Sequence, residues 1–570
     1  MSIDSLTALE ITGLIRLAQM EPELEYLFRH ALVQEAAYDS ILKADRKQLH
    51  LAVAHEMERI YPERLDELAA LLANHYREAG ESQKALEYYK RAETYAFQKF
   101  ANGEAEYNLR AALEICSNED ERAELCYRMG IVIQALGRLD EAENFMREAL
   151  PAFRASRNLN RVADVYNNLS QIIFGKNDVA NSLAVAREGL QEVGDLPPSE
   201  AYAELLRNVA NGCVFNALLD EAETYIPKVL SVAEQSGSKI ALAQALITRG
   251  LIEDRRGKSE QAIATLRRAV SLGEQANHPF SVSRARNNLA YVLIKLGRNI
   301  EAAEQLEYML AYSRRVNSIF GELWYLSEIN ILYLDLGRID EVIALVPAMM
   351  DLLKNSGGKA YRAQVVGARL QVLVYTGKPE EAISDLRAER DDLLRHNDKQ
   401  MVMVYSHTLA LAYTIMQDYN RAAQEVEFGI QTAGIWGGAS DQYLLAKLQA
   451  SSDADISIAR ESFKRGEEIV ESPPTFVDMS TRQYALMHIR AREKNYTEAL
   501  SIAAELAEKY RSVQFRWLSA FILWEAGEIA LKASDRSKAN ELLMQAENEY
   551  KEIHIPMYAA QIETLRMSIV

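Results

Sequence analysis

Cysteine is scarce in this chain of 570 residues. The three cysteines are Cys116, Cys126 and Cys213, and no two of them form a C-x-x-C pair. A sparse set with an odd number of members provides no disulfide framework. The N-terminus also lacks the basic stretch and apolar core of a secretory signal peptide. Both absences favour a protein of the reducing cytoplasm.

Positive charge is also in deficit. Lysine and arginine together number 64 against 82 aspartates and glutamates, which gives a formal net charge of −18. A chain this acidic repels the phosphate backbone of nucleic acids. The most apolar stretch, residues 401–416, is too short to cross a bilayer and contains His407. We therefore expect neither a nucleic-acid partner nor a membrane partner, and interpret residues 401–416 as a buried helix.

Catalytic and metal-binding motifs are absent from the sequence. Four Gly-Lys dipeptides, which begin at Gly175, Gly257, Gly358 and Gly377, lack the upstream glycine of a phosphate-binding loop. The sequence HEMER, residues 55–59, lacks the second histidine of a zinc-binding H-E-x-x-H motif. We expect no enzymatic activity, no cofactor and no metal site.

A repeat with a period of 40 residues dominates the chain. Glycines that would end a helix are spaced by 40 residues or a multiple of 40, at Gly137, Gly257, Gly297, Gly337 and Gly377. The same register predicts turn positions at Asn177, Ala217 and Gln417. A spacing kept over this length indicates an array of helical repeats.

The residues after each turn also follow the period. Five residues after each turn position comes a small or slim residue, and a larger apolar residue often follows one helical turn later. Residues four apart share a helix face, so the pattern predicts close packing of the second helix of each pair. The small positions are Ala142, Ser182, Ala222, Ala262, Ala302, Val342, Ala382 and Ala422.

Polar residues between the helices predict where the second helices begin. The expected N-caps are Asp140, Asp220, Ser259 and Asp340. Glu143 and Glu223 are spaced to complete capping boxes with the first two. Pro379 fits the first position of a helix, where a missing N–H costs nothing.

This pattern resembles the tetratricopeptide repeat (TPR) family. In one repeat the family's positions are filled by Leu289, Ala290, Leu293, Gly297, Ala302, Leu306 and Met309. The resemblance covers roughly residues 65–570 and implies an all-α fold, a right-handed α-solenoid of antiparallel helix pairs. The usual TPR period is about 34 residues, so a period of 40 implies longer helices. We expect overlapping helix pairs over residues 61–116, a regular array over 117–450, and degenerate and C-terminal repeats with a capping helix over 451–570.

Asparagine recurs in phase with the repeat on the first helix of each pair, which lines the concave face in the TPR family. The residues in or beside this phase are Asn167, Asn168, Gln171, Arg207, Asn208, Asn211, Thr248, Arg284, Asn287, Asn288, Tyr291 and Trp324. An amide donates and accepts hydrogen bonds at once, so it suits the backbone of an extended peptide. The alternative is that these amides bond neighbouring helices or water. The sequence leaves both interpretations open.

Residues 26–50 belong to no repeat. They resemble a junction of STAND-class signalling ATPases and cyclase-linked ATPases, in which a winged-helix-like segment ends in F-x-H-A-L-x-Q-E-x-A-Y-x-S-L-L and leads into TPRs. The matching residues are Phe28, His30, Ala31, Leu32, Gln34, Glu35, Ala37, Tyr38, Ser40, Leu42, Arg46, Leu49 and His50. Residues 1–60 are accordingly expected to be winged-helix-like, with a helix and hairpin over residues 5–25.

The pattern of residues 26–50 by itself predicts one amphipathic helix. Its apolar stripe would comprise Leu32, Ala36 or Ala37, Ile41 and Leu42, followed by a basic stretch from Lys43 to Lys47. The basic stretch fits either contact with an upstream domain or a solvated helix end.

The two resemblances together imply a non-catalytic sensor or interaction arm. It would bind a protein or peptide in its concave groove and contact an ATPase domain through residues 26–50. That ATPase would lie before Met1, so we expect either an arm cut from a longer protein or a separately encoded arm. The alternative function is a stand-alone TPR scaffold that assembles a cytoplasmic protein complex.

Overall fold

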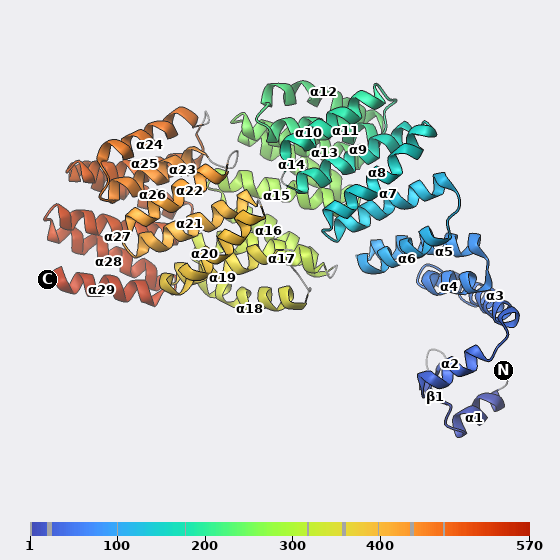
Figure 1. The fold of residues 1–570 in the computed structure, drawn as a ribbon. Coiled ribbons are helices and arrows are strands. Elements are labelled where there is room, and N and C mark those ends of the chain that lie inside the picture. The colour runs from blue at the N-terminus through green and yellow to red at the C-terminus, as the bar shows by residue number, and fades with distance from the viewer. Residues whose placement is uncertain are drawn as a thin grey trace. The chain divides into compact units, whose positions relative to one another are not determined.

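The computed structural model describes residues 3–19, 25–99, 101–176, 178–315, 318–355, 361–396, 398–433, 438–470 and 474–569. Nearly all of this part of the chain is helical, and the chain is a TPR-type α-solenoid (Figure 1). It divides into two compact units, residues 1–157 and 158–570, which are described separately. The boundary falls inside the stretch expected to form one regular array.

The first unit contains the only strands of the described chain, an antiparallel pair that follows its first helix. Its elements are α1 (Ile3–Ile11), β1 (Ile15–Gln19), β2 (Glu25–Phe28), α2 (Ala31–Asp39), α3 (Lys43–Ile60), a 3-10 turn (Pro62–Arg64), α4 (Ala69–Ala79), α5 (Ser82–Gln98), α6 (Asn102–Ile115), α7 (Glu119–Ala135) and α8 (Leu139–Ala155). From α3 onward each helix packs against the next.

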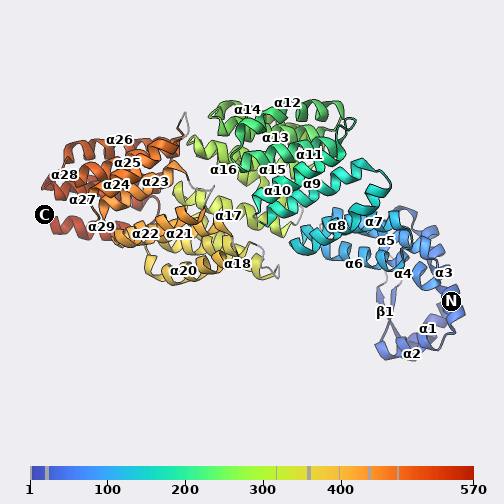
Figure 2. The same cartoon turned by 45° about the horizontal axis from the view of Figure 1, so that its top comes forward.

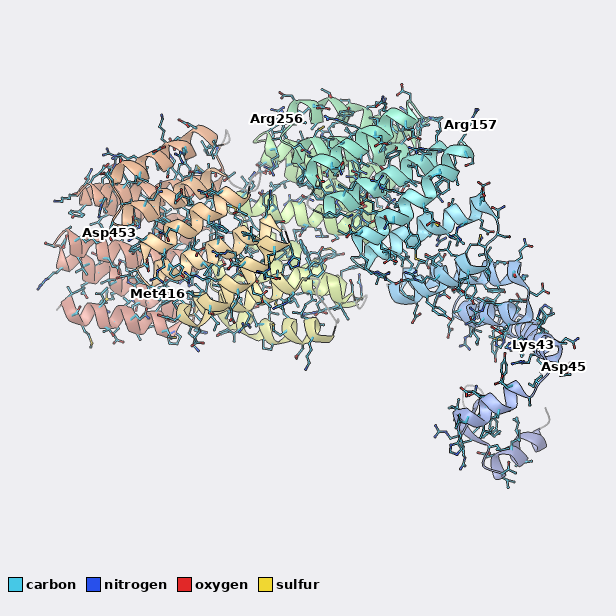
Figure 3. The ribbon with its side chains drawn as sticks, viewed as in Figure 1. Lys43, Asp45, Arg157, Arg256, Met416 and Asp453 are labelled. Carbon is cyan, nitrogen blue, oxygen red and sulfur yellow. The ribbon has the colours of Figure 1, made fainter. Side chains whose placement is uncertain are left out.

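The expectation of one amphipathic helix through Leu32 and Leu42 is wrong. The helix breaks after Asp39, and a second helix starts at Lys43 (Figure 3). The Ser40 hydroxyl donates to the carbonyl of Ala37, a local bond that competes with helix continuation, and Leu42 is extended with ψ of 144°.

The second unit contains twenty-one helices within the described residues. They are α9 (Leu159–Gly175), α10 (Val179–Val193), α11 (Glu200–Phe215), α12 (Leu219–Gln235), α13 (Lys239–Arg255), α14 (Ser259–Gln275), α15 (Pro279–Lys295), α16 (Asn299–Arg315), α17 (Ile319–Asp335), α18 (Ile339–Asn355), α19 (Arg362–Tyr375), α20 (Pro379–Arg395), α21 (Lys399–Ile415), α22 (Tyr419–Ala433), α23 (Ala439–Ser451), α24 (Ile456–Ile469), α25 (Phe476–Arg492), α26 (Tyr496–Ser512), α27 (Arg516–Lys532), α28 (Arg536–Glu552) and α29 (Pro556–Ile569).

The period of the repeat comes from the lengths of helix and turn. Most helices from α7 to α22 have the same length of 17 residues, and two of them with their short turns fill one period. The turn glycines at the predicted positions all have positive φ, and so do Ala217 (58°) and Gln417 (61°). A left-handed residue ends a helix and frees the chain to reverse. The predicted turn register is therefore confirmed, while Asn177 lies outside the described residues.

The predicted N-caps are wrong by one or two positions. Asp140, Asp220 and Asp340 are the second residues of α8, α12 and α18, and Ser259 is the first of α14. One residue separates the left-handed position from the next helix, and it occupies the N-cap site itself. The side-chain caps expected with Glu143 and Glu223 are therefore missing from α8 and α12. The aspartates still lie at the positive end of the helix dipole, and Pro379 is confirmed as the first residue of α20.

Packing in the array follows the predicted small positions. All of them are buried, from Ala142 to Ala422. The stretch 401–416 is confirmed as a buried helix, because α21 contributes Tyr405, Leu409 and Tyr413 to a hydrophobic core. None of the helices in the described part of the chain is both long and apolar enough to cross a membrane.

The C-terminal helices return to the middle of the second unit. Figures 1 and 2 show α27–α29 beside α19–α22. The indole N–H of Trp517 donates to the carbonyl of Tyr375 at 3.1 Å, and the Tyr558 hydroxyl donates to the carbonyl of Val374. Asn299 Nδ2 donates to the carbonyl of Val513 at 3.3 Å. The segment from the end of α26 to α29 thus packs on the turns that follow α15, α17 and α19.

This packing gives one turn glycine a second role. A Cβ on Gly337 would lie 2.7 Å from Cγ2 of Ile553, whereas a Cβ on Gly237 would meet nothing within 4 Å. Both glycines have positive φ, at 73° and 70°. We expect Gly337→Ala to lower the free energy of unfolding by roughly 2–4 kcal/mol and Gly237→Ala by about 1 kcal/mol. Urea denaturation measures both, and equal losses would exclude the close approach to Ile553.

Candidate functional site

The inner layer of the second unit consists of odd-numbered helices. The helices α9, α11, α13 and α15 contact one another in succession, and so do α17, α19 and α21. In a curved stack of helix pairs the helices that approach closely line the concave side. The exposed face of this layer is the inner face, and it carries the in-phase residues predicted from the sequence.

Polar bonds between residues about one period apart link the inner layer. Asn208 Nδ2 donates to Asn167 Oδ1 at 3.0 Å, and Arg284 donates to Gln244 Oε1. Further along the layer, Asn330 Nδ2 donates to Gln371 Oε1 at 3.3 Å. At several places in the array, the periodic polar residues therefore connect neighbouring inner helices by hydrogen bonds.

Three of the predicted site residues are engaged within this layer. Asn167 and Asn208 are buried, and Asn167 Nδ2 also donates to the carbonyl of Ala201 at 3.1 Å. Arg207 is buried as well, and donates to Glu204 Oε2 at 2.9 Å and to Asn208 Oδ1. These three side chains join α9 to α11, as the structural alternative requires.

Buried and partly exposed asparagines of the inner layer are expected to contribute unequally to stability. We expect Asn208→Ala to lower the free energy of unfolding by roughly 1–3 kcal/mol, because it leaves buried partners unsatisfied. Within the described residues, Asn288 bonds only the carbonyl of Arg284 in its own helix, at 2.8 Å, and it is partly exposed. Asn288→Ala should therefore change stability by less than about 0.5 kcal/mol. Thermal denaturation of both variants checks this, and equal losses would contradict it.

The remaining predicted residues keep exposed surface on the inner face. Gln171 and Tyr291 are exposed, and Asn168, Asn211 and Asn287 are partly exposed. The Oδ1 atom of Asn211 is buried and lacks a hydrogen bond in the described part of the chain. Trp324 packs edge-on against Tyr361, with ring centroids 5.8 Å apart, and lies apart from the asparagines of α9 and α11.

Arg284 is a charged residue of the inner face that lacks an ion-pair partner. Its guanidinium lies over the Phe280 ring at 5.8 Å, and no carboxylate of the described residues lies within 4 Å. Burial, helped by the nearby charge of Arg207 and opposed by Glu204, lowers the pKa of Arg284 to about 9. A partly exposed guanidinium without an ion pair favours an anionic group from outside the protein.

Glu328 lies on the same face and was missed by the sequence analysis. It is 40 residues after Asn288, so an extension of the register would have found it. It is partly exposed and has no hydrogen bond or ion pair within the described residues. Burial raises its pKa to about 7. The inner face therefore carries an unpaired guanidinium on α15 and an unpaired carboxyl on α17.

The N-terminal segment presents apolar side chains to solvent. None of the residues of α2 is buried, and Leu32 and Leu42 are 78% and 72% exposed. Ile11, Leu27 and Phe28 are exposed as well. Ile15 is the only buried apolar residue described before α3. Among the residues that the structure describes, this segment has no hydrophobic core of its own.

A histidine pair anchors α2 and α3 to the helices that follow. His50 Nε2 lies 2.9 Å from the Tyr38 hydroxyl, and His50 Nδ1 lies 2.8 Å from His75 Nδ1 on α4. Burial and the neighbouring His50 lower the pKa of His75. Across the described residues, no three histidine, cysteine, aspartate or glutamate side chains lie close enough to hold a metal ion.

No model of a protein family matches this chain, and no curated protein matches its sequence. Among solved structures it is similar to a Rap protein complexed with competence and sporulation factor, at 14% identity over 62% of this chain and 98% of that one, with a TM-score of 0.45. It is also similar to the APC/C hetero-tetramer Cut9-Hcn1, at 13% identity over 85% and 93% of the two chains, with a TM-score of 0.42. A third is aspartyl phosphate phosphatase F from Bacillus subtilis, at 15% identity over 60% and 93%, with a TM-score of 0.41. The fold assignment rests on the order and packing of the helices.

Proposed function

We propose that this chain is a non-catalytic, protein-binding α-solenoid that serves as the sensor arm of a STAND-type signalling ATPase. Its inner face takes a peptide or protein segment, and residues 26–50 contact the ATPase domain. The observation that carries the proposal is the pairing of an uncovered apolar segment at one end with an accessible polar face in the repeats.

The inner face suits an extended peptide that carries charge. Arg284 attracts a carboxylate, and Glu328 attracts an amino or guanidinium group. Tyr291 offers an exposed aromatic surface on α15, the helix that also carries Arg284. Asn168 and Asn288 are partly exposed polar neighbours, whereas Asn167, Arg207 and Asn208 hold the layer together.

The N-terminal segment suits a domain contact. Scattered exposed leucines are normal on a protein surface, but none of the apolar side chains of α2 is buried. Leu32 and Leu42 would be covered by a packed globular partner. The basic stretch from Lys43 to Lys47 borders this surface and supplies charge at its rim.

Ligand binding is tested by capture of a partner with the full chain, followed by titration of the purified pair. We expect Arg284→Gln and Glu328→Gln each to weaken binding by about tenfold. Arg256→Gln is the matched control, because Arg256 lies in a turn (Figure 3) and already pairs with Asp220 and Glu223. Unchanged affinity in the first two variants would reject the inner face as the site.

Coupling is tested with the ATPase that accompanies the chain. We expect the full chain to bind it and to alter its rate of ATP hydrolysis. Leu32→Asp with Leu42→Asp should abolish both effects, whereas Leu394→Asp, an exposed leucine of the repeats, should abolish neither. Stable complexes that form without any ATPase would instead support a stand-alone scaffold.

A further inference from the structure

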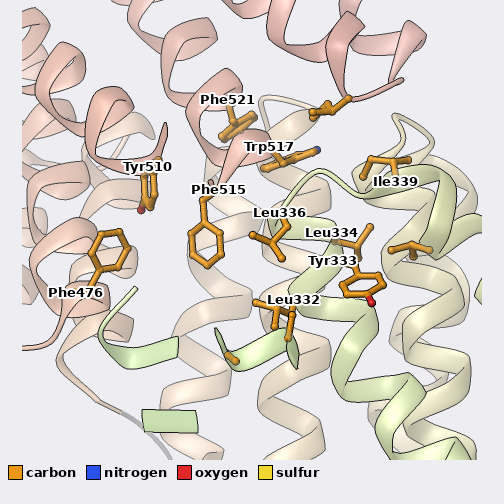
Figure 4. Packing of buried hydrophobic residues seen from close by; sticks show 14 of the residues in the cluster. Leu332, Tyr333, Leu334, Leu336, Ile339, Phe476, Tyr510, Phe515, Trp517 and Phe521 are labelled. Atoms are coloured by element: carbon orange, nitrogen blue, oxygen red, sulfur yellow. The ribbon is translucent and has the colours of Figure 1, made fainter. Parts of the chain in front are cut away.

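A cavity of about 290 Å³ lies inside the second unit, where α25, α26 and α27 pack against α15, α17, α21 and α23. Aromatic rings form much of its wall: Phe476, Tyr484, Tyr510, Phe515, Trp517 and Phe521. These rings are themselves buried. Figure 4 shows five of them beside Leu332 and Leu336 of α17.

One carboxyl group faces this aromatic cavity. Asp335, the last residue of α17, is the only acidic residue among the described lining residues. It is partly exposed and accepts one hydrogen bond, from the Tyr375 hydroxyl at 3.3 Å. No cation of the described chain lies within 4 Å of it. Burial raises the pKa of Asp335 to about 7, and the hydrogen bond from Tyr375 opposes this shift only in part.

The one lysine in the wall does not fill this role. Lys447 Nζ lies 2.7 Å from Glu525 Oε1, and both side chains are buried. Its charge is neutralised by that pair and enclosed by the Tyr484 ring at 4.8 Å. The charge of Asp335 is thus left for a group that enters the cavity.

The structure assigns this cavity as a binding site for a small organic cation, an ammonium group attached to an apolar body. Aromatic faces attract cations and bury apolar groups, and the carboxylate of Asp335 completes the recognition of the charge. The volume lies near the lower limit for small-molecule sites, which fits a ligand of modest size. Asp335, His407 and Thr481 are polar lining residues that keep some exposed surface. The site is separate from the inner face at Arg284 and does not depend on the function proposed for it.

Isothermal titration calorimetry of the full chain at pH 8 tests this assignment with three probes of one shape. These are 2-phenylethylammonium, the neutral 2-phenylethanol and the anionic 3-phenylpropanoate. We expect the ammonium probe to bind at least about tenfold more tightly than the alcohol, and the carboxylate to bind most weakly. Binding of all three with equal affinity, or of none at millimolar concentration, would overturn the assignment.

Variants locate the site. Asp335→Asn should reduce the affinity for the ammonium probe to that for the alcohol and leave the alcohol unchanged. Glu528→Gln is the matched control, because burial also raises the pKa of Glu528 to about 7 but it does not line the cavity. Thr481→Phe places a bulky ring in the wall of the cavity. It should abolish binding of the ammonium probe, which provides a second test if the Asp335 variant does not fold. Undiminished binding in either variant would place the probe elsewhere.

Discussion

Replacing Lys447 with methionine is expected to lower the free energy of unfolding by about 3–5 kcal/mol. Lys447 and Glu525 form an ion pair whose side chains are 1% and 5% exposed. Tyr484 and His488 also contact the Glu525 carboxylate, with His488 Nε2 at 3.2 Å. The pair joins α23 to α27, and removal of the lysine leaves a buried carboxylate without its cation. Chemical denaturation at pH 7 measures the loss.

The pH dependence of this loss follows from the carboxylate. Burial would raise the pKa of Glu525, but Lys447 and His488 outweigh burial and hold it at about 2. The ion pair therefore contributes its full stability above about pH 4.5 and loses it as the pH falls toward 2. Without Lys447, burial raises the pKa of Glu525. The difference between Lys447→Met and the native chain should then shrink as the pH falls.

Two variants separate this ion pair from a general effect of lost charge. The double variant Lys447→Met with Glu525→Gln removes the uncompensated charge and should recover at least half of the lost stability. Lys538→Met breaks the exposed pair of Lys538 with Glu541 and should cost less than about 1 kcal/mol. A large loss in Lys538→Met, or no recovery in the double variant, would contradict the explanation.

Replacing Glu328 with glutamine is expected to stabilise the fold by roughly 2–3 kcal/mol at pH 8. Burial raises the pKa of Glu328 from an ordinary 4.5 to about 7, and no partner among the described residues offsets the cost of burying the charge. The folded carboxyl therefore holds its proton more tightly than the unfolded one. The penalty is absent below pH 4.5, grows up to about pH 7, and is constant above that. Thermal denaturation at pH 8 and at pH 4.5 should show a gain at pH 8 alone.

The same variant links stability to the proposed function. An unpaired carboxyl that destabilises the fold is typical of a group kept for a ligand. Glu304→Gln is the control, because Glu304 is exposed on α16 and should change stability little at either pH. A gain in stability together with weaker ligand binding in Glu328→Gln fits a binding role. A gain without any effect on binding would leave Glu328 as a residue of the fold only.

The sequence predicted the parts of this protein that depend on local geometry. Helices of nearly constant length, separated by short turns, place a left-handed residue at the same point of each repeat whose turn is described. Glycine therefore recurs there, and the period becomes visible in the sequence. Small residues recur for the same reason, because each meets an equivalent neighbour in every repeat. The N-caps were misplaced because the turn is shorter than composition suggests: a single residue after Gly137 already occupies the cap site of α8.

The sequence predicted the positions of the polar residues of the inner layer but not their hydrogen-bond partners. The period identified Asn208 and Asn288 equally well, since both occupy the same place in their helices. In the structure their hydrogen-bond partners differ. Asn208 donates to Asn167 on the neighbouring inner helix, whereas Asn288 donates to a carbonyl of its own helix. Whether an amide has a hydrogen-bond partner on the neighbouring helix depends on the side chains of the adjacent repeat. The position of one residue within its own repeat does not predict those side chains.

Sequence reasoning was sufficient for an acidic, all-α solenoid, its turn register, its close-packed second helices and its unrepeated N-terminal segment. The return of the C-terminal helices onto α15–α19, and the aromatic cavity that results, emerged only from the packing of the folded chain. Trp517 bonds Tyr375, and Tyr558 bonds Val374, across 142 and 184 residues. Each such contact occurs once and leaves no periodic trace. Local spacing in the sequence therefore determines the turns and the small packing positions that recur in the repeats. The cavity at Asp335 is determined by the packing of helices that are far apart in the sequence.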